Sequence, residues 1–166
     1  MTATERFHSM PAHELRLELE ALYADYVACL DEERLEEWPE FFTDDAVYRI
    51  IPRENFERGL PIATLHCESK GYLQDRVVAI RRTAVYAPRY IRRLVSNIRV
   101  LGWKEGSLEV RANYAAFETL RDEMTRVFSV GRYHDRLVVV DDRLKFKEKL
   151  VIFDSELIPN TLIYPL

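Results

Sequence analysis

Glycine is scarce in this sequence, with five residues in a chain of 166, at positions 59, 71, 102, 106 and 131. These positions never produce the spacing of a dinucleotide-binding fingerprint or of a Walker phosphate loop. The segment "FSVGR" around Ser129 also lacks the first glycine of a nucleophile elbow. The sequence therefore argues against nucleotide-dependent chemistry and against a serine hydrolase.

Cysteine is almost absent as well, and Cys29 and Cys67 lie far apart with no CxxC or HxxxH motif. A structural zinc site needs four matched ligands, a Rieske cluster two Cys and two His, and a mononuclear iron two His and a carboxylate. Only "HCE" (66–68) and "YHD" (133–135) gather candidate ligands. Neighbouring residues of a strand face opposite sides, so neither triplet chelates well by itself. We expect no metal or cofactor in this chain.

Long apolar runs are missing too, because the longest uncharged stretches span about ten residues and a membrane helix needs about 20. The start "MTATERFHSM" lacks the pattern of a signal peptide, so we expect a cytoplasmic protein that does not bind membranes. The net charge is -4 and the pI is near 5.7. Although "RRTAVYAPRYIRRL" mixes arginines with aromatics, this acidic balance argues against a nucleic-acid partner.

Charge is unevenly distributed along the chain. Residues 1–57 carry fifteen acidic and five basic side chains, whereas residues 76–104 carry eight basic side chains and no acidic one. One interpretation is two solvated faces of opposite sign. The other is a head-to-tail contact in which the acidic face of one copy meets the basic face of the next.

Hydrophobic periodicity predicts helices first and strands afterwards. Residues 11–30 show a helical apolar stripe, a short helix should end near Trp38, and another should follow Ser69. From about Tyr90 onward the period changes to two, and turn signals separate four long strands. In "RLKFKEKLVIF" the three lysines 145, 147 and 149 alternate with apolar residues and should face outward.

This order predicts an α+β fold: a cystatin-like or nuclear-transport-factor-like cone with N-terminal helices packed on a curved, mostly antiparallel sheet. We expect one domain over residues 1–166, with residues 1–10 loosely ordered and 157–166 forming an interface tail. The hollow of such a cone often holds a ligand. The residues expected to line it are Tyr26, Trp38, Phe42, Tyr48 and Tyr114.

An enzyme within that cone is the alternative interpretation. Proteins of this architecture isomerise or dehydrate small apolar molecules with acid and base groups tuned by an apolar cavity. The chain offers Tyr23, Tyr26, Asp45, Tyr48, His66 and Tyr114 for this purpose. Nine tyrosines, however, are also what ordinary aromatic packing requires. A stand-alone isomerase, dehydratase or small-ligand-binding protein therefore stays open as the second hypothesis.

Four segments together resemble one family. They are "LDEERLEEWPEFFTDDAVYRI", "PRENFERGLP" followed by "ESKGYLQDRV", "RRLVSNIRV", and "DSELIPNTLIYPL". In this order they resemble the small, or beta, subunit of aromatic-ring-hydroxylating dioxygenases, above all those of salicylate hydroxylases and of terephthalate or anthranilate dioxygenases. One departure is Arg93, where many small subunits have histidine.

The resemblance implies a structural subunit of an oxidoreductase used in aromatic compound catabolism. The Rieske iron-sulfur cluster and the mononuclear iron would belong to a large, or alpha, subunit, and this chain would carry no catalytic residue. It also implies a homotrimer, assembled as three small and three large subunits.

The C-terminal residues 157–166 contain no charge. A contiguous apolar segment of this kind usually marks an interface, so we expect a neighbouring subunit to bury it. The residues expected at subunit interfaces are Arg92, Arg93, Leu157, Ile158, Leu162, Ile163 and Tyr164.

Overall fold

The computed structural model of the protein describes residues 3–84, 86–155 and 162–166. Its helical elements are α1 (Ala3–Ser9), α2 (Ala12–Asp31), the 3-10 helix η1 (Trp38–Phe41), α3 (Arg53–Glu57) and α4 (Lys70–Arg82). Its strands are β1 (Phe42–Pro52), β2 (Leu65–Cys67), β3 (Arg89–Lys104), β4 (Ser107–Leu120), β5 (Arg126–Val140) and β6 (Arg143–Phe153). The predicted α+β class and the four long strands after residue 88 are confirmed.

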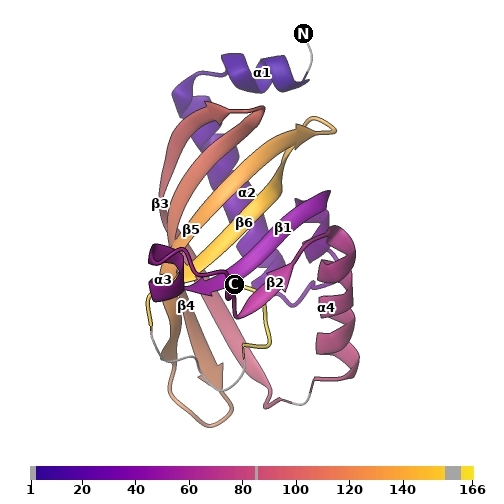
Figure 1. Cartoon of the computed structure of the whole chain (residues 1–166). Helices are drawn as coiled ribbons and strands as arrows, with labels where there is room; N and C mark the ends of the chain where they lie inside the picture. The colour runs from indigo at the N-terminus through magenta and orange to yellow at the C-terminus, as the bar shows by residue number, and fades with distance from the viewer. Residues whose placement is uncertain (1–2, 85, 156–161) are drawn as a thin grey trace.

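The strands form one six-stranded sheet in the order β2-β1-β6-β5-β4-β3. All neighbours pair antiparallel except β1, which pairs parallel to β6. The sheet is strongly twisted and open, with α2 running along one face and the short α3 lying on the other (Figure 1). The result is the predicted cone, in which α2 occupies the concave face.

Two tight turns set the register of the long hairpins. Glu105 and Gly106 join β3 to β4 with φ of 48° and 74°, and Asp141 and Asp142 join β5 to β6 with φ of 49° and 61°. Positive φ at both central residues matches the twist of the flanking strands. Asp and Gly are among the residues that adopt this conformation at least cost.

The inner face of the sheet carries the core. Leu108, Val110 and Tyr114 of β4 point inward and are buried, as their alternation with polar residues predicts. Helix α2 covers them with its own buried stripe, which includes Leu19 and Tyr23. One continuous hydrophobic cluster therefore joins helix and sheet.

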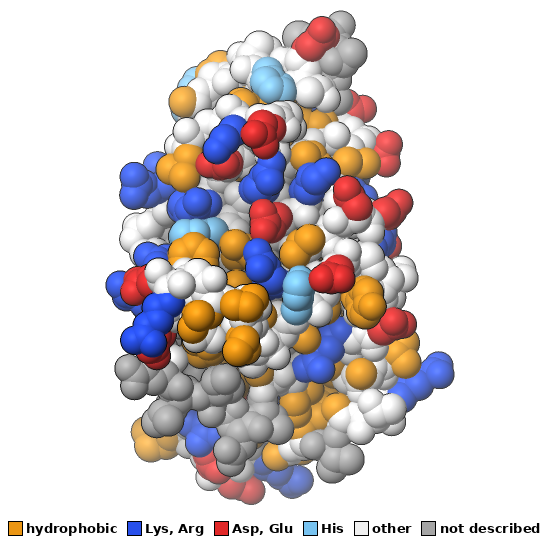
Figure 2. Space-filling model, in the orientation of Figure 1, with side chains coloured by type: hydrophobic (Ala, Val, Ile, Leu, Met, Phe, Trp, Pro, Cys, Tyr) orange, Lys and Arg blue, Asp and Glu red, His pale blue; other side chains and the backbone are white. Residues whose placement is uncertain are grey.

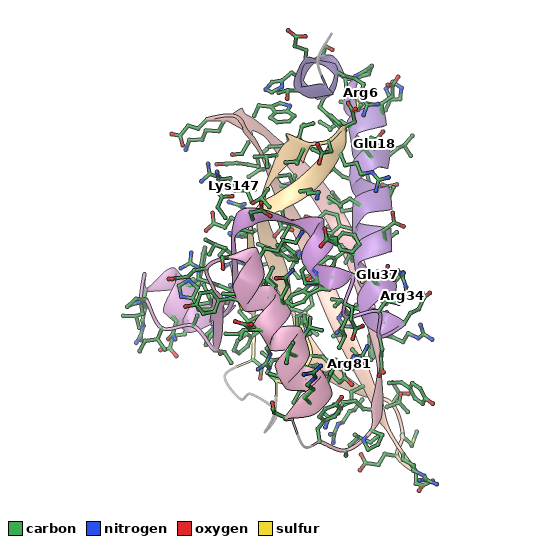
Figure 3. The ribbon with its side chains drawn as sticks, turned by 90° about the vertical axis from the view of Figure 1, so that its right-hand side faces the viewer. Arg6, Glu18, Arg34, Glu37, Arg81 and Lys147 are labelled. Carbon is green, nitrogen blue, oxygen red and sulfur yellow. The ribbon has the colours of Figure 1, made fainter. Side chains whose placement is uncertain are left out.

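Helix α4 packs against β1 and η1. Ser69 caps it by accepting a hydrogen bond from the backbone N–H of Tyr72. On its outer side Arg81 donates to Oε1 of Glu36 at 2.8 Å and also to the backbone carbonyl of Glu33. Figure 3 shows Arg81 on α4 below the end of α2, where Arg34 and Glu37 lie. These contacts hold α4 to the turn that follows α2.

Within the segment 1–10, which the sequence predicted to be loosely ordered, Ala3–Ser9 forms the helix α1. Phe7 is buried at 1% exposure, and the ring of His8 stacks on Trp103 with centroids 3.9 Å apart. A single buried aromatic with a stacked neighbour is enough to dock a two-turn helix, and the sequence pattern of so short a segment does not reveal it.

No helix in the described ranges is long and apolar enough to cross a membrane.

Candidate subunit-docking site

The five predicted pocket residues Tyr26, Trp38, Phe42, Tyr48 and Tyr114 are all buried, at 2% exposure or less. Four of them meet. The Trp38 ring lies edge-on to Phe42 and Tyr48 at 5.6 and 5.3 Å, and its Nε1 donates to the hydroxyl of Tyr26 at 3.2 Å. The four therefore form one aromatic cluster of the core, and a role in lining a ligand pocket stays a prediction.

Tyr114 stacks on Tyr133 with ring centroids 4.7 Å apart, and its hydroxyl lies 2.9 Å from Oγ of Ser129. Burial raises the pKa of both tyrosine hydroxyls. They consequently remain protonated across the physiological range.

A buried charged cluster lies beside these rings, and the sequence pattern did not predict it. The Nζ of Lys149 donates to Oδ2 of Asp135 at 3.0 Å, and the hydroxyl of Tyr23 donates to the same oxygen at 2.6 Å. Lys149 and Asp135 are both 0% exposed. Burial raises the pKa of Asp135 and lowers the pKa of Lys149 to about 8, while their mutual attraction opposes both shifts.

The expectation that Lys149 faces outward is wrong because of a β-bulge. The pairing of β5 with β6 slips between Arg136 and Leu137, so Phe146 and Lys149 both point inward. One extra residue in a strand reverses the facing of every residue beyond it. The signal available in the sequence was the break in alternation at "KEKLVIF".

Of the candidates for acid and base catalysis, Tyr23 belongs to this cluster through its hydrogen bond to Asp135, whereas Asp45 and His66 lie away from it. The Asp45 side chain is 70% exposed beside Lys147, and His66 lies 3.6 Å from Glu68 on the surface. The tyrosines are buried in the core. Among the described residues no group of three or more His, Cys, Asp or Glu could hold a metal ion.

Arg93 is not an open interface residue, contrary to expectation. It is 3% exposed, forms an ion pair with Asp31 of α2, and donates to the backbone carbonyl of Pro165. Its neighbour Arg92 faces the opposite side of β3 and is exposed. Alternation along the strand explains the difference, because two adjacent arginines cannot share a face.

The described part of the tail is covered by its own chain. Ile163, Tyr164 and Leu166 are buried without any second subunit, so the expectation that a neighbour covers them is wrong for this part. Leu162 is partly buried. Leu157 and Ile158 lie outside the described residues.

The exposed apolar surface lies instead on the outer face of β3, β4 and β5. Leu94 of β3 pairs with Ala115 of β4, which pairs with Val130 of β5, while Arg92 pairs with Phe117, which pairs with Val127. Exposure reaches 60% for Leu94 and 61% for Val127. We call this surface the outer patch, defined as Tyr90, Arg92, Leu94, Phe117, Val127 and Val130. A contiguous cluster of exposed apolar side chains on one face usually marks an interaction surface.

A charged network supports the outer patch from the inside. Glu118, between Phe117 and Thr119 on β4, is 1% exposed and accepts hydrogen bonds from Arg89 at 2.6 Å and from Arg126 at 2.8 Å. Its two oxygens thus bind the strands on either side, β3 and β5. A buried carboxylate with two guanidinium partners fixes the spacing of these strands.

The same outer face is mainly charged elsewhere. Figure 2, drawn from the side of α3, shows Lys and Arg side chains interspersed with Asp and Glu above a group of hydrophobic side chains. Arg111 and His134 are cross-strand partners there, and the ring of His134 lies edge-on to Phe56 of α3 at 5.1 Å. Burial, with the nearby charges of Arg111 and Arg132, lowers the pKa of His134 to about 4.

An open, curved sheet whose interior is filled by aromatic side chains and a buried ion pair defines an α+β cone protein. Within that class, the model of the family of ring hydroxylating beta subunits matches residues 26–160, and the chain belongs to this family. It is therefore a small subunit of the aromatic-ring-hydroxylating dioxygenase type, as the resemblance predicted.

Individual relatives agree with this assignment. The chain is 34% identical to the anthranilate 1,2-dioxygenase small subunit of Burkholderia cepacia, over 90% of this chain and 92% of that one. It is 25% identical to a terminal oxygenase beta subunit of terephthalate 1,2-dioxygenase from Comamonas, over 90% and 97%. Among solved structures, the beta subunit of a candidate aromatic-ring-hydroxylating dioxygenase from Novosphingobium aromaticivorans is 35% identical with a TM-score of 0.84, covering 93% and 99%.

Proposed function

We propose that this chain is a noncatalytic structural subunit that assembles as a homotrimer and supports three large oxygenase subunits. The observation that carries the proposal is the pairing of a filled interior with an exposed apolar surface. The outer patch offers its hydrophobic area to other chains, whereas Asp135 and Lys149 are sealed from solvent. Within the cytoplasm, the Rieske cluster and the mononuclear iron would belong to the large subunit.

A surface complementary to the outer patch exists on the opposite side of the same chain. A groove of about 840 Å³ lies between α2, η1 and the β5–β6 turn. Its lining is mainly acidic, with six carboxylates against the two basic residues Arg143 and Lys145, and its apolar residues include Leu22, Phe41 and Leu144. The acidic lining residues are Glu18, Asp25, Glu37, Glu40, Asp141 and Asp142. Glu18 and Glu37 are labelled along this side in Figure 3.

The charge and the polarity of the two surfaces match. The outer patch combines apolar side chains with the exposed guanidinium of Arg92, and the groove combines apolar side chains with an excess of carboxylates. Two different surfaces in contact make a head-to-tail interface, which closes a ring when the rotation allows. We propose that the outer patch of one copy docks in this groove of the next copy.

Charge reversal tests this contact. Arg92→Glu should shift the isolated subunit from trimer towards monomer in sedimentation, because it places a carboxylate against the acidic groove. Adding Glu18→Lys and Glu37→Lys to the same chain should restore the trimer. A trimer unaffected by Arg92→Glu would contradict the proposed contact.

Coexpression tests the role in the assembly. The chain should copurify with a large subunit as a coloured complex that absorbs visible light and hydroxylates an aromatic substrate. The chain alone should be colourless and inactive. A small subunit that never copurifies with a large one, or that shows activity alone, would contradict the proposal.

A further inference from the structure

The segment 162–166 is held by side chains from four different elements. Arg76 of α4 donates through Nη2 to the first two carbonyl oxygens of the segment, each at 2.8 Å. Arg93 of β3 donates to the carbonyl oxygen of Pro165. Both arginines are at least partly buried and each has an Nε with no partner. Their guanidinium groups are thus directed at the backbone of one short peptide.

Two tyrosines bind the final residue of the segment. The hydroxyls of Tyr26 (α2) and Tyr48 (β1) donate to the carbonyl oxygen of Leu166 at 3.0 and 3.1 Å. The Tyr48 hydroxyl also accepts from the N–H of Leu166 at 2.9 Å. Both tyrosines belong to the aromatic cluster around Trp38, so this cluster forms the base of the site.

The side chains of the segment fill the same site. Leu166 is 1% exposed, and Ile163 and Tyr164 are also buried. The hydroxyl of Tyr164 lies 2.9 Å from that of Tyr86 and 3.4 Å from Oε1 of Glu33, and the two rings pack edge to face at 5.4 Å. The segment is therefore recognised through both its backbone and its side chains.

This mode of binding differs from that of the sheet. A strand is held by backbone partners in register, whereas these hydrogen bonds to the backbone of 162–166 come from arginine and tyrosine side chains. Arginine and tyrosine donors placed on carbonyl oxygens, together with burial of the consecutive side chains 163–166, are the chemistry of a peptide-recognition site. The segment also lies beyond residues 26–160, the part matched by the family model.

We propose that the Arg76, Arg93, Tyr26 and Tyr48 side chains form a peptide-binding site for an extended apolar peptide. Residues 162–166 are its ligand, bound in the same chain. The segment is a separable unit that leaves the site and returns to it while the sheet and helices stay folded. The site accepts the same peptide when it is supplied as a separate molecule.

Truncation with complementation tests the proposal directly. A chain ending at Thr161 should melt at lower temperature than the full chain, and a synthetic peptide of residues 162–166 should raise its melting temperature in a saturable manner. A peptide of the same composition in scrambled order should have no effect. Calorimetric titration should show one site per chain.

Matched tyrosine variants of the truncated chain identify the binding groups. Tyr48→Phe should weaken peptide binding roughly tenfold, because it removes a hydroxyl that both accepts from and donates to the peptide backbone. Tyr114→Phe should leave it unchanged, since that hydroxyl bonds to Ser129. Equal affinities in the two variants, or a folded truncated chain that binds no peptide, would overturn the proposal.

The full chain provides the test if the truncated one does not fold. Arg76→Met should speed hydrogen exchange at the amides of residues 162–164 and 166 while β4 and β5 keep their protection. Exchange that is unchanged there, or that speeds only together with β4 and β5, would show ordinary core packing and overturn the proposal.

Discussion

At Gly131 the strands β5 and β6 approach so closely that no side chain fits. A Cβ at this position would lie 2.0 Å from the carbonyl oxygen of Ile152 and 2.9 Å from Cα of Phe153, both backbone atoms. Gly131→Ala should therefore lower the free energy of unfolding by about 1–3 kcal/mol or more. Gly71→Ala is the control, because its Cβ meets only Oγ of Ser69 at 3.5 Å. In urea denaturation, Gly71→Ala should leave the free energy of unfolding unchanged or raise it by about 0.4–1 kcal/mol.

The buried pair of Lys149 and Asp135 predicts a second residue-scale effect. Lys149→Met should lower the free energy of unfolding by about 3–5 kcal/mol, because Asp135 loses its ionic partner in the core. Adding Asp135→Asn should recover much of this loss, since the amide oxygen still accepts from Tyr23. Denaturant unfolding of the two variants measures the difference. A Lys149→Met variant as stable as the parent chain would contradict the assignment of a buried ion pair between Lys149 and Asp135.

His134 predicts a pH dependence. Its pKa is about 4 in the folded chain, below the usual 6.5, because of burial and then of Arg111 and Arg132. Between these two pH values the unfolded state binds more protons, so this histidine makes stability rise as pH rises from 4 to 6.5. His134→Gln should flatten the stability curve over that window relative to the parent chain.

Individual side chains were predictable where they repeat a simple pattern. The inward positions of β4 followed from alternation with polar residues. The inward position of Lys149 was not predictable in this way, because a bulge reversed its facing. The burial of Arg93 was not predictable either, because its partner Asp31 is 62 residues away. Tail residues such as Tyr164 were predicted to lie at a subunit interface, because the residues that contact them within the chain are distant in sequence. Long-range partners and register shifts leave almost no local signal.

The length of each helix or strand determined whether it could be recognised from the sequence pattern. The 20-residue α2 and the long strands β3 to β6 have enough periods to be recognised. The 7-residue α1 and the 5-residue α3 do not. The parallel pairing of β1 with β6 also has no local signature, because it joins segments from opposite ends of the chain. The order of helices and strands predicted the overall cone, and the family resemblance implied the same fold.

Helix α1 should behave as a separately docked element. Phe7→Ala removes its buried anchor, so α1 should detach and its amides should exchange at nearly unfolded rates while the sheet remains protected. The free energy of unfolding should fall by at most about 3 kcal/mol, the low end for a Phe→Ala change, because only α1 is released. Leu17→Ala on the exposed side of α2 is the control and should change the free energy of unfolding by less than about 0.5 kcal/mol. Loss of protection throughout the sheet would contradict this independence.

At the scale of the whole molecule, the proposed contact joins two surfaces, the acidic groove and the outer patch. The sequence predicted an acidic face from residues 1–57 but not the groove itself, whose lining also includes Asp141 and Asp142. The outer patch could have been found from the outward positions of β3, β4 and β5, where Leu94, Phe117 and Val127 stand in place of polar residues. It became evident only once the register placed these three side chains on neighbouring strands.

Assembly through the outer patch is the central claim, and one measurement tests it most directly. A Leu94→Asp/Val127→Asp variant, coexpressed with the large subunit, is compared by size-exclusion chromatography with light scattering against an Ile62→Asp/Val78→Asp variant, which alters exposed apolar residues outside both the outer patch and the acidic groove. We predict that the patch variant remains folded, becomes monomeric and loses the large subunit, while the control keeps the complete assembly. A patch variant that retains the assembly would contradict the claim.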